Sequence, residues 1–465
     1  MIFHDNTDTI CALSTPPGTG AIAVIRISGS RSFEVLNSIF RPAAKDLDMH
    51  HVASHTIHYG TIIEGDSIQD EVLVSVFRAP NSYTGEDVAE ISCHGSVYVQ
   101  QKIIELLLTT GLRMASPGEF TFRAFSNGKL DLIQAEAVTD LIASHSKTSH
   151  DLAVQQMRGG FSGKIRELRK ALVDFTSLIE LELDFSEEDV EFADRNALNT
   201  LLEKLLSETD SLIQSFKMGN VIKNGIPVAI IGKPNVGKST LLNAILNEEK
   251  AIVSEIPGTT RDAIEDTIVI GGYSFRFIDT AGLRAAENKV ETIGIERTWA
   301  KIGEASIILY VFDVTSQSFH DVMAEINEIK EITAEQSNHL VLVGNKTDQL
   351  QELPKGFKDF VALETIFVSG KRKENIHLLA AHLVSLVKKV NLSDRTIISN
   401  SRHYEALVRA HESIESVQTG LAEGIPTDLV TIDIRKALYH LGEITGEITT
   451  DEILDNIFSR FCIGK

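Results

Sequence analysis

The sequence predicts a multidomain fold with an N-terminal α+β domain, an all-α helical domain and an inserted α/β domain of the P-loop type. Three observations predict it. Residues 1–118 mix strand-like and helix-like segments. Residues 119–220 and 386–465 carry apolar residues at helical spacing. Residues 221–385 alternate short apolar segments with helices, the pattern of a parallel sheet.

In the first domain, residues 21–27 and 72–77 are strand-like and residues 101–108 are helical. In the helical domain, apolar residues recur every three or four positions, which predicts buried stripes. The stripes comprise Ile165, Leu168, Leu172, Phe175 and Ile179, then Leu198, Leu202 and Leu205, and, near the C-terminus, Leu407, Ala410, Ile414, Val417 and Leu421. Neither helical segment completes a core alone, so we expect them to pack together around the inserted domain; the alternative is four independent domains in a row.

The composition is that of a globular protein, with 43% hydrophobic and 23% charged residues among 465. Cys11, Cys93 and Cys462 lie far apart, which argues against a disulfide framework or a structural zinc site. We see no signal-peptide pattern and no apolar run of membrane-spanning length, and therefore expect a cytoplasmic protein. The net charge of −21 argues against broad nucleic-acid binding but allows a nucleic acid held by a basic partner.

The inserted domain opens with strand-like residues 226–231, followed by Gly232-Lys-Pro-Asn-Val-Gly-Lys-Ser239. This matches G-x4-G-K-[ST] between a strand and a helix, the context of a phosphate-binding loop. Backbone N–H groups would wrap the phosphates, Lys238 would neutralise the β and γ oxygens, and Ser239 would bind Mg²⁺. The predicted contacts in this loop are Asn235, Val236, Gly237, Lys238, Ser239 and Thr240.

Further strand-like segments at 275–278, 307–312, 340–343 and 366–368 carry the other loops of a guanine-nucleotide site. Asp279 can orient Mg²⁺ through water, and the Gly282 N–H can reach a γ-phosphate. The carboxylate of Asp348 can accept two hydrogen bonds from the guanine N1–H and 2-amino group, a pair that adenine lacks. The predicted contacts are Asp279, Thr280, Ala281 and Gly282; Asn345, Lys346, Thr347 and Asp348; Ser369, Gly370 and Lys371; and the switch residues Gly258, Thr259 and Thr260, with Thr260 on Mg²⁺. In order, these motifs predict a P-loop GTPase (G) domain.

The residue after Gly282 is Leu283, where many small GTPases have a glutamine that orients the attacking water. A leucine side chain cannot form that hydrogen bond. The water must therefore be positioned from elsewhere, and an arginine finger or a monovalent cation could supply the missing positive charge.

Motifs along nearly the whole chain share one resemblance. They are Thr15-Pro-Pro-Gly, Arg26-Ile-Ser-Gly29, Ser82-Tyr-Thr-Gly-Glu-Asp87, Pro117-Gly-Glu-Phe120, Arg123-Ala-Phe-Ser-Asn-Gly-Lys-Leu-Asp-Leu132, Gly258-Thr-Thr-Arg-Asp262, Ile293-Gly-Ile-Glu-Arg297 and Phe461-Cys-Ile-Gly-Lys465. Together they resemble the tRNA-modification GTPase family MnmE, also called TrmE. The terminal pentapeptide attached to a GTPase is very specific for this family.

The resemblance implies that the N-terminal domain, similar to folate-dependent aminomethyltransferase domains, binds 5-formyltetrahydrofolate or a related tetrahydrofolate. Arg26, Glu90, Lys129 and Lys465 match the folate contacts. It also implies a homodimer formed by the N-terminal domain. With the flavoprotein MnmG, in a heterotetramer-type complex that holds tRNA, the family installs a carboxymethylaminomethyl or related group at carbon 5 of the wobble uridine.

The resemblance further implies that the G domains meet across the dimer in a K⁺-dependent way that activates hydrolysis. Asn235 matches the asparagine that ligates K⁺, and Glu291 matches the glutamate that helps to position water. The surrounding loop supplies the other matched positions, Ser254, Glu255, Ile256, Pro257, Gly258 and Thr259, of which Ser254, Ile256 and Thr259 would lie at the cation.

Two rival functions remain open from the residues alone. A ribosome-assembly GTPase would have a similar nucleotide core, but such proteins typically append a basic RNA module. An autonomous folate-dependent transferase would leave the G domain a regulatory role.

Two smaller features also carry alternatives. Cys462 stands fourth from the end, but Gly464 and Lys465 fit prenylation poorly, leaving an inert tail or a functional thiol near the folate site. Residues 52–63 look extended, which would turn His55 and His58 to opposite sides and favours a surface cluster with His51 over a metal site.

Overall fold

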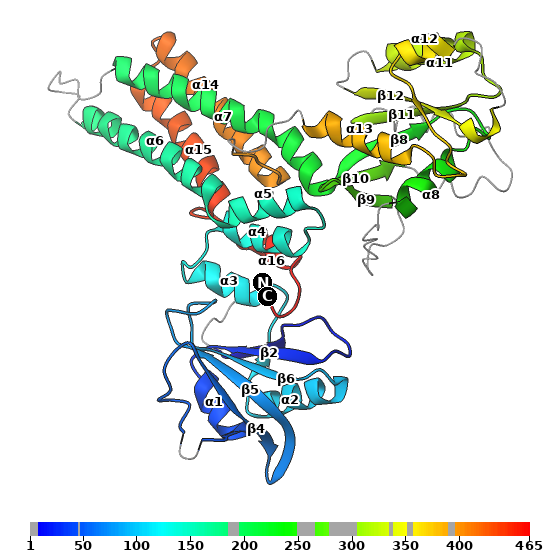
Figure 1. Ribbon diagram of the computed structural model, residues 1–465. Coiled ribbons are helices and arrows are strands. Elements are labelled where there is room, and N and C mark those ends of the chain that lie inside the picture. Colours follow the sequence, from blue (N-terminus) through cyan, green and yellow to red (C-terminus); the bar gives the residue numbers. More distant parts are fainter. Residues whose placement is uncertain are drawn as a thin grey trace. The chain divides into compact units, whose positions relative to one another are not determined.

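The computed structural model describes residues 8–44, 47–184, 195–248, 266–278, 305–333, 338–350, 357–388 and 396–465 (Figure 1). The chain forms two compact units: Met1–Thr139, Gln156–Leu206 and Arg409–Lys465 make the first, and Asp140–Gln155 with Ser207–Val408 makes the second. Helices α7 (Arg195–Asn224) and α14 (Ser401–Ala422) contribute to both units. The residue boundaries of the predicted domains therefore stay predictions.

The N-terminal part contains a seven-stranded sheet in the order β3-β4-β5-β6-β2-β1-β7. Neighbouring strands are antiparallel, except that β1 and β7 are parallel. The strands are β1 (Ile10–Leu13), β2 (Ile22–Ser28), β3 (Phe40–Pro42), β4 (Thr56–Glu64), β5 (Ser67–Phe77), β6 (Val88–His94) and β7 (Arg113–Met114). The predicted strands correspond to β2 and β5.

Helices α1 (Ser32–Ile39) and α2 (Val97–Thr109) cover one face of this sheet (Figure 1). Alternate strand residues such as Ile25, Val74 and Ile91 are buried there against the helices. The predicted helix at 101–108 lies within α2. On the opposite face, Tyr59 and Leu73 are 53% and 47% exposed, so this face is open in the single chain.

The prediction of an extended segment at 52–63 is wrong at its start, because β4 begins only at Thr56 and His55 has a φ of 63°. The guanidinium of Arg78 explains the turn. It donates hydrogen bonds to the carbonyl oxygens of Val52 (2.8 Å) and of two preceding residues, Met49 (3.0 Å) and His50 (2.7 Å). The nearby histidines have separate neighbours: His51 pairs with Asp48, His55 contacts Ser54 and His58 contacts Thr56.

Helices make up most of the remaining first unit. They are α3 (Glu119–Ser126), most of α4 (Leu132–Ile142), α6 (Gly160–Asp184), α15 (Thr427–Thr445) and α16 (Asp451–Phe458), whereas α5 (Lys147–Met157) lies mainly in the second unit. The stripe residues Ile165, Leu168 and Leu172 are buried, and α6 packs along α15. Helices α6 and α15, from before and after the inserted segment, therefore pack within one unit.

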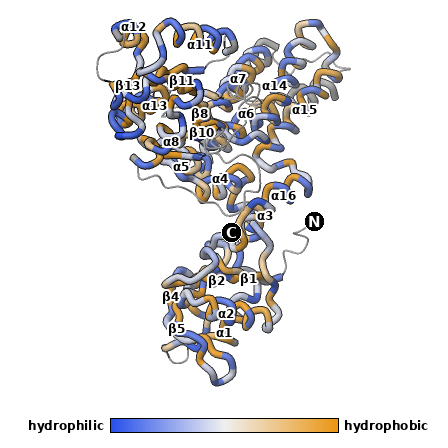
Figure 2. Tube along the Cα trace, turned by 90° about the vertical axis from the view of Figure 1, so that its right-hand side faces the viewer, coloured by the Kyte–Doolittle hydropathy of each residue, from blue (hydrophilic) through white to orange (hydrophobic). Residues whose placement is uncertain are grey.

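Figure 2 shows hydrophobic and hydrophilic residues alternating along α14 and α15, as expected for helices with one buried face. Among the helices that the structure describes, none is both long and apolar enough to cross a bilayer.

The second unit contains a six-stranded sheet in the order β13-β12-β11-β8-β10-β9, parallel except for β9 against β10. Its strands are β8 (Ile226–Ile231), β9 (Asp266–Ile270), β10 (Tyr273–Ile278), β11 (Ile307–Asp313), β12 (His339–Asn345) and β13 (Ile366–Phe367). Helices α8 (Lys238–Glu248) and α13 (Ile376–Lys388) share a core with one face; α11 (Phe319–Ile332) and α12 (Phe357–Ala362) share a core with the other. The predicted α/β architecture is confirmed.

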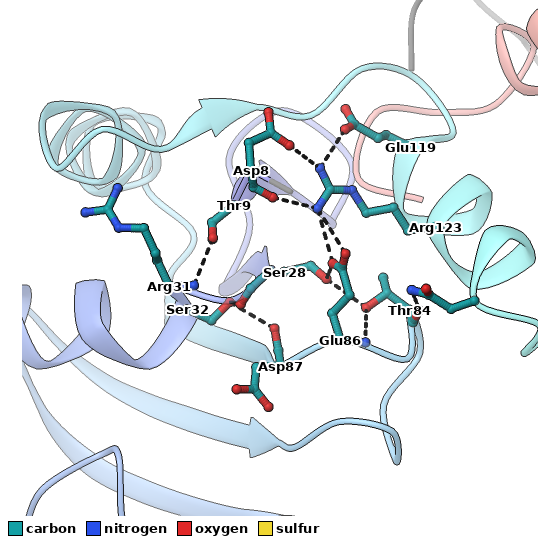
Figure 3. Close-up of polar contacts among 12 residues, drawn as sticks. Asp8, Thr9, Ser28, Arg31, Ser32, Thr84, Glu86, Asp87, Glu119 and Arg123 are labelled. Carbon is teal, nitrogen blue, oxygen red and sulfur yellow. Dashed lines mark hydrogen bonds and ion pairs between the residues drawn. The ribbon is translucent and has the colours of Figure 1, made fainter. Parts of the chain in front are cut away.

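A buried ion network stands beside the first sheet (Figure 3). Arg123 of α3 is 0% exposed and pairs with Asp8 (2.6 Å), Glu86 (3.2 Å) and Glu119 (3.0 Å). Arg113 holds Glu119 from a second side at 2.6 Å. Three of the family-like motifs thus meet in one network, which connects α3, the segment before β1 and the loop between β5 and β6.

The network predicts a loss of stability in acid. Burial raises the pKa of Glu119, but hydrogen bonds from Arg113 and the Ser116 N–H outweigh it and hold this pKa below 4.5. A carboxyl group with a lowered folded-state pKa stabilises fully above its unfolded value and loses that contribution as the pH falls through the folded value. We therefore expect the free energy of unfolding to fall between about pH 5 and pH 3. Glu119→Gln should be about 3 kcal/mol less stable at neutral pH and show a shallower acid slope.

Chemical denaturation across this pH range measures both effects. Replacing the exposed Glu105 of α2 by glutamine is the control, and its slope should match that of the unchanged protein. Equal slopes for Glu119→Gln and the unchanged protein would contradict the assignment.

Candidate nucleotide and folate sites

The P-loop follows the carboxyl end of β8, where two neighbouring strands also end. Asn235 has a φ of 64°, a left-handed conformation that asparagine tolerates better than most residues, and its side chain is exposed. Helix α8 begins at Lys238, whose Nζ donates hydrogen bonds to the carbonyl oxygens of Gly232 (2.7 Å) and Lys233 (2.8 Å). The loop thus gathers backbone N–H groups and one ammonium group at a helix N-terminus, which suits a phosphate.

Asn345, the last residue of β12, joins the P-loop to the loop after β13. Its Nδ2 donates to the Val236 carbonyl at 2.9 Å, and its Oδ1 accepts from the Gly370 N–H at 3.0 Å. The side chain is buried with both ends paired, so it holds a single orientation. Gly237 makes room for it: its φ is 95°, and an added Cβ would collide with Nδ2 of Asn345.

The predicted guanine-reading residues lie beside this bridge. Asp348 is in the short 3₁₀ helix η2 (Thr347–Gln349), and its Oδ1 accepts from the Ser369 hydroxyl at 2.7 Å. That hydroxyl oxygen accepts in turn from the Arg372 N–H at 3.0 Å. The hydroxyl therefore orients the carboxylate that is expected to read guanine, whereas Lys371 is exposed to solvent.

Lys346 is positioned by a carboxylate that the sequence reasoning did not single out. Its Nζ pairs with Oδ2 of Asp313 at 2.7 Å, and its backbone has a φ of 69°. Burial raises the pKa of Asp313, but the hydrogen bonds from Lys346 and Thr315 outweigh it and lower that pKa. Asp313 thus stays ionised at neutral pH. Its position at the end of β11, next to the end of β12, was the signal in the sequence.

The switch loops of the predicted nucleotide site lie outside the described residues. This holds for Ser254, Glu255, Ile256, Pro257, Gly258, Thr259 and Thr260, and for Asp279, Thr280, Ala281, Gly282, Leu283 and Glu291. The described part therefore comprises the P-loop, the loop after β12 and the loop after β13.

A second site lies on the open face of the first sheet. Arg26 of β2 and Glu90 of β6 are directly paired in register, and their side chains meet at 2.8 Å. The Arg26 guanidinium stands 5.2 Å from the ring centroid of Tyr83 and 5.5 Å from that of Phe120. Phe120 is fully buried and Tyr83 partly exposed, so the rings hold the guanidinium beside the carboxylate, and the charged groups with Tyr83 could receive a planar heterocycle.

The C-terminal residues complete this second site. The Gly464 carbonyl oxygen accepts from the Ser14 hydroxyl at 3.2 Å and from Nη1 of Arg26 at 3.4 Å. Gly464 has a φ of 93°, and an added Cβ would collide with the backbone of Leu13. Burial and the charge of Arg26 lower the pKa of Lys465, partly offset by Glu90. The tail is therefore packed against β1, and Cys462 within it is exposed.

The structure thus brings Arg26, Glu90 and Lys465 together, whereas Nζ of Lys129 donates to the Pro80 carbonyl at 3.0 Å. The sequence reasoning missed the parts played by Tyr83, Phe120 and Ser14. Two of them lie inside the family-like motifs, which was the available signal, but a motif does not say which ring will face a given cation.

Comparisons with known proteins match nearly the whole chain. A family model described as the MnmE helical domain matches residues 132–462, and one described as the GTP-binding protein TrmE N-terminus matches residues 9–129. Relatives named tRNA modification GTPase MnmE are similar over nearly full length. In Flavobacterium psychrophilum the identity is 51% over 467 residues (100% of each chain), in Flavobacterium johnsoniae 53% over 468 (99% of this chain and 100% of the relative), and in Bacteroides fragilis 49% over 470 (99% and 100%). The chain therefore belongs to the MnmE (TrmE) family of tRNA modification GTPases.

Proposed function

We propose that this protein hydrolyses GTP to GDP and phosphate, in the cytoplasm, and uses that reaction in the modification of tRNA wobble uridines. The observation that carries the proposal is the Asn345 side chain, which hydrogen-bonds to both the P-loop and the loop after β13. A ligand that spans both loops has phosphates at one end and a base at the other. The names of the relatives favour tRNA modification over ribosome assembly.

Within this proposal each residue has a chemical role. Lys238 neutralises charge on the β and γ oxygens, and Ser239 with Thr260 would hold Mg²⁺ while Asp279 orients its water. Mg²⁺ offsets charge on the phosphates. Asp348 reads guanine, and the Ser369 hydroxyl keeps its carboxylate in place. Glu291 helps to position the attacking water in place of the glutamine that Leu283 replaces.

The proposal includes a K⁺ ion held in part by Asn235, whose exposed amide and left-handed backbone fit a cation ligand at the tip of the P-loop. Ser254, Ile256 and Thr259 would be its other ligands. The ion would supply the positive charge that an arginine finger supplies in other GTPases. K⁺ would promote contact between the two G domains of the dimer, and the rate of GTP hydrolysis would then depend on that contact.

We expect GTP hydrolysis to be faster in K⁺ than in Na⁺ at equal ionic strength, on the order of tenfold or more. Asn235→Gly should abolish the difference, because glycine keeps the left-handed backbone and removes the amide. Phosphate release measures the rate, and Asn243→Gly in α8 tests for a general effect of losing an amide. Equal rates in the two salts would overturn the K⁺ assignment and leave the GTPase proposal standing.

We also propose a homodimer formed through the open face of the first sheet. Register places Tyr59 opposite Leu73, and Ile57 in the same row as Arg26 and Glu90. Facing residues of paired strands lie on one side of a sheet, so these exposed apolar side chains and the second site share a face. An apolar face of this kind is typical of a surface that becomes buried in an assembly.

Leu73→Asp should weaken the dimer, because the interface would then bury an unpaired carboxylate. Light scattering at a series of protein concentrations measures the mass. The matched control is Leu378→Asp in α13, an equally exposed leucine in the second unit. A dimer that survives Leu73→Asp unchanged would exclude this face.

The second site would take 5-formyltetrahydrofolate or a related tetrahydrofolate as the one-carbon donor. Arg26, Glu90 and Lys465 carry the charges to orient it, the partly exposed Tyr83 provides an aromatic surface, and the buried Phe120 supports the Arg26 guanidinium from below. With the flavoprotein MnmG and tRNA in a heterotetramer-type complex, the bound folate would supply carbon for the carboxymethylaminomethyl-type group. Lys129 stays a proposed contact.

Arg26→Gln should weaken binding of 5-formyltetrahydrofolate by about tenfold or more, because it removes a charge-assisted hydrogen bond. Calorimetry measures the affinity, and the mass of the wobble nucleoside after incubation with the flavoprotein and tRNA measures the modification. GTP hydrolysis should not change. Arg31→Gln, at an exposed arginine of the same domain paired with Glu34, is the control. Equal folate affinity in both variants would contradict the site.

A further inference from the structure

Lys233, directly after the first glycine of the P-loop, connects that loop to a helix on the far face of the sheet. Its Nζ pairs with Oε1 of Glu325 in α11 at 2.6 Å. The two side chains are 51% and 25% exposed, so the pair is partly shielded from solvent. The interaction with the Glu325 carboxylate raises the pKa of Lys233, which keeps the amine charged.

Glu325 is itself held from inside the fold. Its Oε2 accepts a hydrogen bond at 2.8 Å from the hydroxyl of Tyr310, a β11 residue that is 1% exposed. Burial and the nearby Glu325 carboxylate raise the pKa of Tyr310, so the phenol remains a neutral donor. One carboxylate oxygen of Glu325 therefore accepts from Tyr310 of the core strand, and the other pairs with Lys233 of the P-loop.

The helix that carries Glu325 has a well-defined start. Ser318 caps α11, and Asp321 completes a capping box with it. Asp321 lies one turn before Glu325, and its charge also acts on Lys233. Both acidic side chains that face Lys233 thus come from the first two turns of a capped helix, which limits how far the ion pair can shift.

The main chain of Lys233 contacts the group expected to hold the phosphates. Its carbonyl oxygen accepts from Nζ of Lys238 at 2.8 Å. One residue therefore receives Lys238 on its backbone and extends its own side chain to Glu325. Displacing Lys233 would move an acceptor that sets the direction of the Lys238 ammonium group.

We infer that Tyr310, Glu325 and Lys233 form a strut that positions the P-loop, so that Lys238 is held in line for the phosphates of GTP. None of the three needs to touch the nucleotide through its side chain; they are positioning residues. The inference rests on the proposed role of the P-loop as the phosphate site. It predicts an effect on phosphate binding and hydrolysis with no effect on guanine recognition, because Asp348 belongs to another loop.

Lys233→Met should weaken binding of GTP and GDP about two- to fivefold and lower kcat by a similar factor, the range of a partly exposed ion pair. The preference for GTP over ATP should stay the same. Glu325→Gln should behave alike. Tyr310→Phe should give a smaller loss of the same kind, because it removes only the hydroxyl. Lys330→Met, at an exposed lysine later in α11, is the matched control.

The decisive variant exchanges the charges, with Lys233→Glu and Glu325→Lys in one chain. If the strut acts through the ion pair, the double variant should recover a large part of the affinity lost by each single change. Fluorescent GDP and GTP titrations measure binding in the full-length protein, and thermal unfolding monitors the fold. Lys233→Met binding like Lys330→Met, or an exchange no better than the single changes, would overturn the inference.

Lys238→Ala separates the strut from the assignment on which it rests. If Lys238→Ala loses binding and hydrolysis while Lys233→Met resembles the unchanged protein, the strut is wrong and the phosphate site stands. If Lys238→Ala itself binds and hydrolyses GTP normally, the P-loop is not the phosphate site, and both the proposed function and the strut are overturned.

Discussion

The first unit depends on one buried cation. Arg123 has no exposed surface and draws Asp8, Glu86 and Glu119 from three separate parts of the chain. A buried guanidinium that lost these carboxylates would carry a large desolvation cost, so the three segments are held where the charges can pair. Glu86 lies in the same loop as Tyr83, and Glu119 precedes Phe120, the two rings near Arg26. The geometry of the proposed folate site therefore depends on an ion network that includes none of the four proposed folate contacts.

In the second unit, the buried group that connects several segments is a neutral amide, that of Asn345. Parallel strands place the loops after β8, β12 and β13 at one edge of the sheet, as open α/β sheets do. The Asn345 amide then connects two of these loops through one donor and one acceptor. In both units, a buried polar side chain that contacts several segments aligns loops that could otherwise move independently.

The sequence predicted the architecture well, because the patterns behind it are local. The strand at 226–231 and the glycine-rich loop after it are fixed by near neighbours in the chain. The ion network could not be predicted in this way. Asp8 and Arg123 are distant in sequence, and no periodicity relates them. The prediction of an extended segment before Thr56 was wrong for the same reason. The turn there is held by the guanidinium of Arg78, which follows β5 and is distant in sequence. The family-like motifs contained three residues of the network, but a motif does not indicate whether its residues bind a ligand or pair with one another.

The left-handed backbone at Asn235 has a consequence for how this position can drift in evolution. Most side chains are excluded by the conformation, and the few that tolerate it differ in chemistry: glycine has no ligand atom, and aspartate would bring a negative charge next to the phosphates. If the proposed cation role is correct, asparagine is the one residue that meets both demands. Few replacements of Asn235 would then be tolerated, although its side chain is exposed. In relatives that do not use the cation, we would expect glycine to be the first residue to replace it.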